Sequence, residues 1–334
     1  MRDLFKQIVA AGPGGAALAV HKDGELVVDE WAGDWSRDDV VNVFSVGKGV
    51  VAALAHRHLT GLDRPVREWW PEFTTDCAVA DLLSHRAGLP AIRRELPDGS
   101  LFDWTAMTGA LAAEHPWWPP GERHGYHAVT FGWLVGEVLR RATGRTVREL
   151  VRDLGIDGLS VGLADGTPVR DVLPPEPNGS PPRMPASEIT VKAFANPAEQ
   201  LTPGLPNTAR WRAAEIPAAN VHANARALAT LYGELLTSPN LPEMIEPRSE
   251  GHDEVLGSPT RFGLGFMLAN PTRPFSPNPR AFGHSGSGGA LAFADPDEGF
   301  AFAFTPSRTL LTAAGPDPRW TPLIEALYRR SSRR

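Results

Sequence analysis

The sequence "VFSVGKGVVAALAHRHL", residues 43–59, places Ser45 and Lys48 three positions apart at the start of an apolar run. Side chains three positions apart on a helix share one face, so this spacing predicts contact between the hydroxyl and the amine. A serine at a helix N-terminus lies among unpaired N–H groups, and their field favours an alkoxide. Apolar surroundings would lower the pKa of Lys48 and let it accept the serine proton. The pair is therefore a candidate nucleophile and base, and a buried lysine paired with a carboxylate is the alternative.

Gly47 and Gly49 flank the lysine, although each glycine costs a helix roughly 0.5–1 kcal/mol relative to alanine. They predict either close packing of a buried helix or space for a substrate, and the sequence leaves both open. Lysine is also scarce, because only four of the 33 basic residues are lysines. Arginine cannot give up its proton at ordinary pH, so a lysine within an apolar element is informative.

Composition limits the functional classes of this 334-residue chain. Its net charge of −6 argues against a nucleic-acid partner or an anionic membrane surface, since both need a basic face. No apolar stretch reaches the roughly 20 residues of a membrane span, and Pro13 interrupts the small apolar residues near the N-terminus. We therefore expect a cytoplasmic protein with no metal or cofactor. The single cysteine, Cys77, is expected to be a small buried residue.

Strand patterns lie at both ends of the chain, and helical patterns dominate its middle. Strands are expected at residues 15–21, 25–33, 261–268, 290–296 and 299–306, and helices at residues 1–10, 45–61, 79–85, 131–144, 224–236 and 320–330. This order predicts an α+β fold in which one antiparallel sheet is built from both chain ends and flanked by helices. The expected division is a sheet domain of residues 1–64 and 218–334 and an inserted, mainly helical lobe of residues 65–217. Within the lobe, the proline-rich residues 164–217 predict a functional cover or a disordered segment.

Three further motifs carry chemistry. Tyr126, in "ERHGYHAVTFGWLVGE" (122–137), precedes an apolar helical run, and a phenol near a lysine can relay a proton; a packed tyrosine is the alternative. The glycine-rich "FGHSGSGGALAFADP" (282–296) predicts an edge strand that offers N–H groups to a carbonyl oxygen, or simply a glycine-rich turn. In "DLLSHRAGLP" (81–90), His85 is expected to fasten a loop.

In this order the motifs resemble the serine β-lactamase and penicillin-binding-protein superfamily over about residues 14–306. The chain is most similar to the class C-like branch, which includes family VIII carboxylesterases and D-aminopeptidases. The resemblance implies a β-lactamase-like fold, with Ser45 as the acylated nucleophile and Lys48 and Tyr126 sharing the general-base role. It also implies an oxyanion hole formed by the backbone N–H groups of Ser45 and Ser287.

Two departures from the family's motifs bear on the substrate. Tyr126-His127-Ala128 replaces Tyr-x-Asn, so the asparagine amide that holds a β-lactam amide is missing. The family's Lys-Thr-Gly is replaced by three residues that, with His127, are expected to bind substrate: His284, Ser285 and Gly286. Both changes favour a carboxylesterase acting on small or medium esters. A transacylase or cyclase, a D-aminopeptidase, a weak β-lactamase and a non-catalytic binding protein stay open as alternatives.

Overall fold

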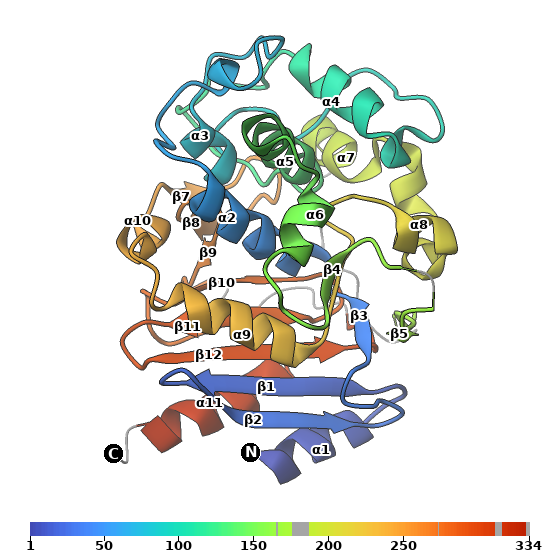
Figure 1. Cartoon of the computed structure of the whole chain (residues 1–334), viewed down its shortest axis with the longest axis vertical. Coiled ribbons are helices and arrows are strands. Elements are labelled where there is room, and N and C mark those ends of the chain that lie inside the picture. The colour runs from blue at the N-terminus through green and yellow to red at the C-terminus, as the bar shows by residue number, and fades with distance from the viewer. Residues whose placement is uncertain (165, 176–186, 273, 311–315, 332–334) are drawn as a thin grey trace.

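The main sheet contains eight strands taken from both ends of the chain (Figure 1). Its order is β2-β1-β12-β11-β10-β9-β8-β7, and neighbouring strands are antiparallel throughout. The strands are β1 (Ala16–Lys22), β2 (Glu25–Ala32), β7 (Ser249–His252), β8 (Pro259–Phe262), β9 (Met267–Leu268), β10 (Phe282–Ser285), β11 (Leu291–Asp295) and β12 (Phe300–Pro306). This computed structural model describes residues 1–164, 166–175, 187–272, 274–310 and 316–331. The predicted α+β fold is confirmed.

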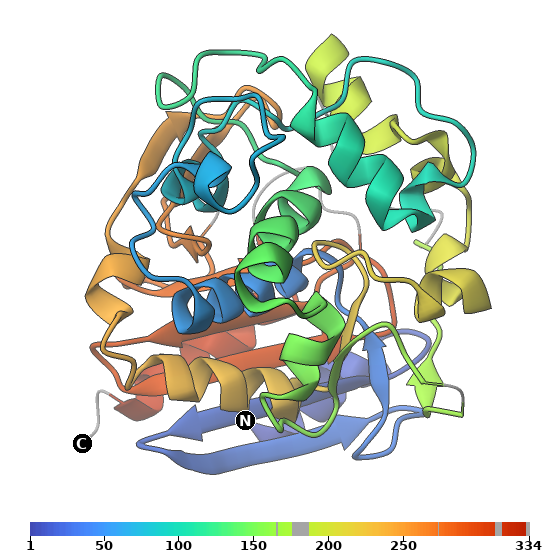
Figure 2. The ribbon, with the colours of Figure 1, turned by 45° about the horizontal axis from the view of Figure 1, so that its top comes forward.

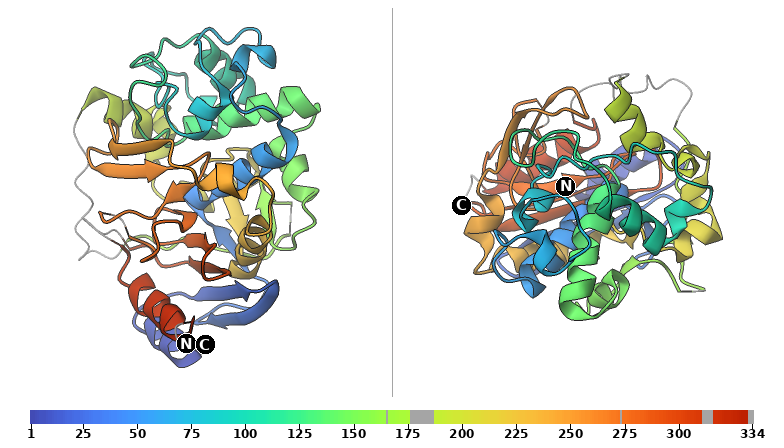
Figure 3. Two further views of the ribbon diagram at one scale, coloured as in Figure 1. Left: turned by 90° about the vertical axis from the view of Figure 1, so that its left-hand side faces the viewer. Right: turned by 90° about the horizontal axis from the view of Figure 1, so that it is seen from above.

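Helices cover both faces of this sheet. They are α1 (Arg2–Ala10), α2 (Gly47–His58), α3 (Val79–Leu83), α4 (Trp104–Ala112), α5 (Thr130–Thr143), α6 (Val147–Arg152), α7 (Glu188–Ala195), α8 (Ala209–Ala213), α9 (Ala225–Leu235), α10 (Leu241–Ile245) and α11 (Trp320–Ser331). Helices α1 and α11 lie together at the end of the molecule that holds both termini, whereas α9 lies on the opposite face (Figures 1 and 3). Helix α2 runs between the sheet and α5, as Figure 2 shows. The candidate nucleophile, Ser45, therefore lies just before a helix at the centre of the molecule.

Alternation of phenylalanine and alanine along β12 gives the sheet a face of large side chains and a face of small ones, on which helices pack differently. A strand turns successive side chains to opposite sides, so the three phenylalanines share one face and the two alanines share the other. The phenylalanine face meets the terminal helices, with Phe5 6.4 Å from Phe304 and Tyr328 5.2 Å from Phe300 between ring centroids. The small side chains on the other face leave room for α9 to pack closely on β1 and β12.

A second, smaller sheet has the order β4-β6-β3-β5 and leads directly to Ser45. Its strands are β3 (Val40–Asn42), β4 (Leu159–Val161), β5 (Val169–Arg170) and β6 (Val221–Ala223). Strands β4 and β5 belong to residues 65–217, whereas β3 and β6 belong to residues 1–64 and 218–334. This sheet therefore joins the segments that we predicted to form separate domains. The division into residues 1–64 with 218–334 and residues 65–217 stays a prediction.

Four local expectations need correction. Helix α2 begins at Gly47, and Ser45 lies in a 3-10 turn, Phe44–Val46, just before it. The same helix ends at His58, before Gly61, because Leu59 is already extended. Residues 261–268 belong to two strands, β8 and β9, since Gly265 has φ +91° and bends the chain between them. Residues 164–217 contain α7 and α8, so a disordered segment is wrong for the described part, whereas a functional cover stays a prediction; residues 165 and 176–186 lie outside the described residues.

Candidate active site

Ser45 and Lys48 are in contact, as their spacing predicts. Lys48 Nζ lies 3.1 Å from Ser45 Oγ, 2.6 Å from the carbonyl oxygen of Ala128 and 3.2 Å from that of Ala218. Lys48 is fully buried, whereas Ser45 is half-buried and therefore accessible from solvent. None of these three partners carries a charge, so the structure does not support the alternative of a lysine that neutralises a carboxylate.

Burial and hydrogen bonding both favour a neutral Lys48. Removal of water holds the pKa of Lys48 well below the ordinary lysine value, because the charged form loses its hydration. A neutral amine has two N–H groups and one lone pair. The two carbonyl oxygens can accept both N–H groups, which leaves the lone pair for the hydroxyl of Ser45. The arrangement is therefore that of a base aimed at a hydroxyl group.

Close packing around the two glycines fixes the position of α2. A Cβ atom at Gly47 would lie 2.7 Å from the carbonyl oxygen of Pro217, and one at Gly49 would collide with the hydroxyl of Tyr232. Both glycines thus allow α2 to approach its neighbours, so packing accounts for them and space for a substrate is not needed as an explanation. Phe44, directly before Ser45, has φ +48°, a left-handed conformation that costs a non-glycine residue on the order of 1–2 kcal/mol.

Tyr126 lies beside Lys48. Lys48 Nζ is 4.7 Å from the centroid of the phenol ring, and the ring stacks on Phe262 with a centroid separation of 6.2 Å. The backbone N–H of Tyr126 donates to both carboxylate oxygens of Asp253, at 3.0 and 3.1 Å. The structure therefore brings together the three residues predicted to be catalytic.

Asp253 is a site residue that the sequence did not reveal. Its buried carboxylate also accepts hydrogen bonds from Val255 N, Leu256 N and Thr260 Oγ1, at 2.9 to 3.0 Å. These bonds anchor the loop that carries Tyr126 to the hairpin of β7 and β8. Because 127 positions separate Asp253 from Tyr126, no local motif connects them.

The glycine-rich segment lies directly against the chain that leads to Ser45. A Cβ atom at Gly286 would collide with the carbonyl oxygen of Val43, so the two backbones touch. Gly286 and Ser285 are half-buried and Ser287 is exposed. Strand β10 is an interior strand of the sheet, and β9 pairs with it only at Phe282 and Gly283; the prediction of an edge strand is thus wrong for the strand as a whole. The segments that carry Ser45 and Ser287 are neighbours.

His284 is buried at the end of β10 in a defined tautomer. Its Nδ1 lies 2.7 Å from the carbonyl oxygen of Ser285, so Nδ1 carries the proton and donates it. Burial, with Lys48 nearby, lowers the pKa of His284 to about 3. Nε2 is buried with no hydrogen-bond partner among the described residues. The ring is therefore uncharged and offers an acceptor, whereas a lysine at this place would offer only donors.

His127 differs from the other predicted substrate-binding residues, because both of its ring nitrogens are already used by the backbone. Nδ1–H donates to the carbonyl oxygen of Gly125 at 2.7 Å, and Nε2 accepts from Leu89 N at 3.2 Å. His127 N in turn donates to Nδ1 of His85, which fastens this loop as predicted. Burial lowers the pKa of His127 to about 3. We therefore assign His127 to the support of the Tyr126 loop, since its ring has no nitrogen left for a substrate.

Three other expectations concern features outside the site. Cys77 is buried, as predicted, and burial raises the pKa of its thiol. Across the described ranges, no cluster of three or more histidine, cysteine, aspartate or glutamate side chains could hold a metal ion. In the same part of the chain, no helix has the length and apolar character needed to span a membrane.

Comparison with known proteins identifies the family. The model of the Beta-lactamase family matches residues 1–321. The chain belongs to the Beta-lactamase family. The resemblance seen in the Ser45, Tyr126 and His284 motifs is thus confirmed over nearly the whole chain.

Relatives of this Beta-lactamase family member include esterases. The chain is 33% identical to "Esterase/beta-lactamase LipL" of Mycobacterium tuberculosis over 343 residues, which covers 89% of this chain and 78% of that protein. A penicillin-binding protein homologue from Caulobacter crescentus is 35% identical, with a TM-score of 0.89 and coverage of 98% of this chain and 96% of that one. A family VIII carboxylesterase is 32% identical, with a TM-score of 0.85 and coverage of 98% and 97%. The chain is a serine hydrolase with the fold of β-lactamases and penicillin-binding proteins.

Proposed function

We propose that this protein is a carboxylesterase that forms an acyl-enzyme on Ser45 and acts on small or medium uncharged esters. The observation that carries the proposal is the buried amine of Lys48, 3.1 Å from Ser45 Oγ, whose other partners are two carbonyl oxygens. Two of the relatives described above are named as esterases, which supports the same substrate class.

Acylation begins with transfer of the Ser45 hydroxyl proton to Lys48, with Tyr126 relaying the proton. Ser45 Oγ forms a bond to the ester carbonyl carbon, and the π electron pair of the carbonyl group moves to its oxygen. The backbone N–H groups of Ser45 and Ser287 stabilise that oxyanion; loss of one such donor typically lowers the rate ~10²–10³-fold. The electron pair then returns, the bond to the alcohol oxygen breaks, and the alcohol leaves with the proton held by Lys48 and Tyr126.

Deacylation repeats these steps with water as the nucleophile. Water gives a proton to Lys48 and Tyr126 while its oxygen bonds to the acyl carbon. When the tetrahedral intermediate collapses, the bond to Ser45 Oγ breaks and Ser45 regains the proton. The products are a carboxylic acid and an alcohol, and no redox partner is required.

Two features favour neutral esters over β-lactams. His284 is uncharged and presents an acceptor at Nε2, so it cannot form an ion pair with the carboxylate of a β-lactam. Ala128 contributes only its backbone carbonyl, which Lys48 already occupies, where an asparagine would offer an amide. A site that leaves polar groups of a ligand unpaired discriminates strongly against that ligand.

The test is hydrolysis of p-nitrophenyl acetate, butyrate and octanoate by the wild type and by Ser45→Ala. We expect turnover of the short esters and its loss in Ser45→Ala, with Ser36→Ala, a change at an exposed serine, as the matched control. Mass spectrometry after treatment with a fluorophosphonate probe should find the adduct on Ser45. Turnover retained by Ser45→Ala would refute the proposal. Nitrocefin or a D-alanine anilide consumed faster than every ester would replace the carboxylesterase with a β-lactamase or a peptidase.

A further inference from the structure

We propose that Asp317, Arg319 and Trp320 are positioning residues that hold the turn carrying the Ser287 N–H group of the oxyanion hole. This inference rests on the proposed function, because it concerns how the same oxyanion is stabilised. Trp320 is the first residue of α11, and Asp317 and Arg319 lie just before it. The turn of residues 286–290 joins β10 to β11.

The turn of residues 286–290 is held by its own backbone hydrogen bonds and by contact with the residues that precede Ser45. Gly286 N donates to the carbonyl oxygen of Ala290 at 2.8 Å, and Gly289 N donates to that of Gly286 at 3.1 Å. Gly286 also touches the backbone of Val43, two residues before Ser45. Ser287 is exposed at the tip of this turn, so its orientation depends on what holds the residues that follow it.

The start of α11 holds those residues. Arg319 Nη2 donates to the carbonyl oxygen of Gly288 at 2.7 Å, and Trp320 Nε1 donates to that of Gly289 at 2.8 Å. A Cβ atom at Gly289 would collide with the side chains of both Arg319 and Asp317, so the turn lies directly on this pair. Leu310 N also donates to the carbonyl oxygen of Gly288, at 3.2 Å. The peptide groups that follow Ser287 are therefore fixed by side chains and one backbone N–H from the far end of the chain.

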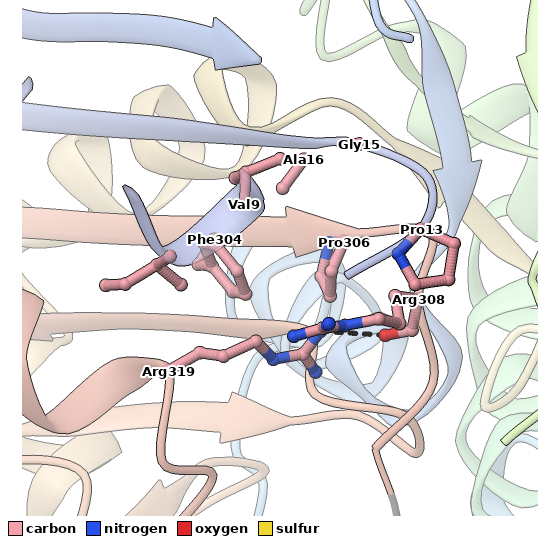
Figure 4. A pocket seen from close by; sticks show the side chains of 9 residues that line it. Val9, Pro13, Gly15, Ala16, Phe304, Pro306, Arg308 and Arg319 are labelled. Atoms are coloured by element: carbon pink, nitrogen blue, oxygen red, sulfur yellow. Dashed lines mark hydrogen bonds between the residues drawn. The ribbon is translucent and has the colours of Figure 1, made fainter. Parts of the chain in front are cut away.

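Arg319 is itself rigidly held. Its Nε and Nη2 donate to the two carboxylate oxygens of Asp317 at 2.9 and 2.7 Å, and the two side chains are only 6% and 4% exposed. Its Nη1 donates to the carbonyl oxygen of Arg308 at 2.8 Å, the bond drawn in Figure 4 beside the end of β12. The ring of Phe304 lies 5.5 Å from the guanidinium carbon.

A purely structural role would not require this pair. When two opposite charges are buried, the hydration that they lose offsets much of their mutual attraction. Apolar side chains of similar volume therefore often stabilise a protein just as much as a buried ion pair does. Apolar side chains could fill the space, but they could not donate to the carbonyl oxygen of Gly288. The ion pair with Asp317 holds the guanidinium group of Arg319 in one orientation. In that orientation Arg319 donates to the carbonyl oxygen of Gly288, next to Ser287.

The magnitude follows from the sensitivity of oxyanion holes to geometry. Misplacement by about 1 Å can lower a rate ~10²-fold, and loss of a donor lowers it ~10²–10³-fold. Trp320→Phe removes one hydrogen bond and keeps an aromatic ring, so we expect kcat for p-nitrophenyl butyrate to fall about tenfold. Arg319→Met removes the shorter of the two hydrogen bonds to the carbonyl oxygen of Gly288, leaving only that from Leu310 N at 3.2 Å, and it also unpairs Asp317. We expect kcat to fall about 100-fold. KM should stay within about threefold in both, because the oxyanion forms only after binding.

Arg141→Met is the matched control. Arg141 also donates to two carboxylates, those of Glu137 and Glu72, but it lies on α5. We expect its kcat to stay within about threefold of wild type. The affinity for phenylboronic acid reports on the transition state, because its tetrahedral adduct on Ser45 uses the oxyanion hole. This affinity should weaken in proportion to kcat/KM in Trp320→Phe and Arg319→Met but not in Arg141→Met.

Amide hydrogen exchange of residues 282–290 provides a readout that does not depend on activity. Exchange should be faster in Trp320→Phe than in wild type and unchanged in Arg141→Met. If Trp320→Phe folds and keeps both wild-type kcat and wild-type exchange, the proposal is overturned, whatever Arg319→Met does. A wild-type protein that hydrolyses no ester would refute the proposed function. In that case the exchange of residues 282–290 still decides whether α11 holds the turn.

Discussion

Replacement of Lys48 tests whether a neutral amine is the base. Lys48→Met removes the amine and keeps an unbranched side chain in the buried site, whereas Lys48→Arg keeps a positive charge that cannot be given up near neutral pH. General-base catalysis contributes ~10²–10⁴ to a rate, so kcat/KM should fall at least about 100-fold in each variant. That fall corresponds to about 2.7 kcal/mol of lost transition-state stabilisation.

The assay is the burst and steady-state release of p-nitrophenol from p-nitrophenyl butyrate, which separates acylation from deacylation. Both phases should slow, because the same base serves both steps. Lys6→Met, at an exposed lysine of α1, is the control and should retain wild-type kinetics. Activity of Lys48→Arg within about tenfold of wild type would refute the base role, since that variant has no proton acceptor at this position.

Protein stability provides a second readout of the same group. Burial lowers the pKa of Lys48 in the folded chain below its ordinary value of 10.5, so the unfolded chain binds more protons between the two values. Stability of the wild type should therefore rise relative to Lys48→Met as the pH increases toward 10.5, by up to about 1.4 kcal/mol per pH unit. Urea unfolding of both proteins at pH 7, 8 and 9 measures this slope. Identical slopes would mean that Lys48 keeps its proton in the folded state.

Two further substitutions test the support and the selectivity of the site. Asp253→Asn places an amide N–H₂ group against N–H and O–H donors that need an acceptor. It should lower the free energy of unfolding by about 1–3 kcal/mol in urea and lower kcat for p-nitrophenyl butyrate about tenfold. Asp76→Asn, at an exposed carboxylate, is the control and should change neither. His284→Lys introduces a donor with a charge, and it should raise the ratio of nitrocefin to ester turnover about tenfold; an unchanged ratio would exclude His284 as a selectivity residue.

Local patterns in the sequence predict the strands and the hairpin well. Asp23 and Gly24 both adopt positive φ, at 53° and 83°, as a two-residue turn between β1 and β2 requires. The alternation of phenylalanine and alanine in β12 predicts a strand, because successive side chains of a strand point to opposite faces. The 3-residue spacing of Ser45 and Lys48 likewise needs only helical geometry to bring the two side chains together.

Features that depend on contacts between distant parts of the chain could not be predicted from the sequence. Helices α7 and α8 lie in the proline-rich segment, and their only local signals are the caps Ser187 and Thr208, whose side chains accept from Thr190 N and Trp211 N. Phe44 gives no sign of its positive φ, because a phenylalanine rarely adopts that conformation. The bonds of Arg319 to the turn after Ser287 join positions 31 residues apart through a side chain that would ordinarily be placed at the surface.

The titratable side chains around Ser45 share one property that bears on the substrate. Burial lowers the pKa of Lys48, His85, His127 and His284, so it shifts all four basic groups of the site toward their uncharged forms. A charged substrate group would have to enter without a fixed partner of opposite charge, which is costly in a desolvated site. In the proposed mechanism the negative charge of the tetrahedral intermediate is different, because it would develop beside the backbone N–H groups of Ser45 and Ser287. A site of this kind gains more from a neutral ester, which acquires charge only in the transition state, than from a substrate that carries charge on arrival.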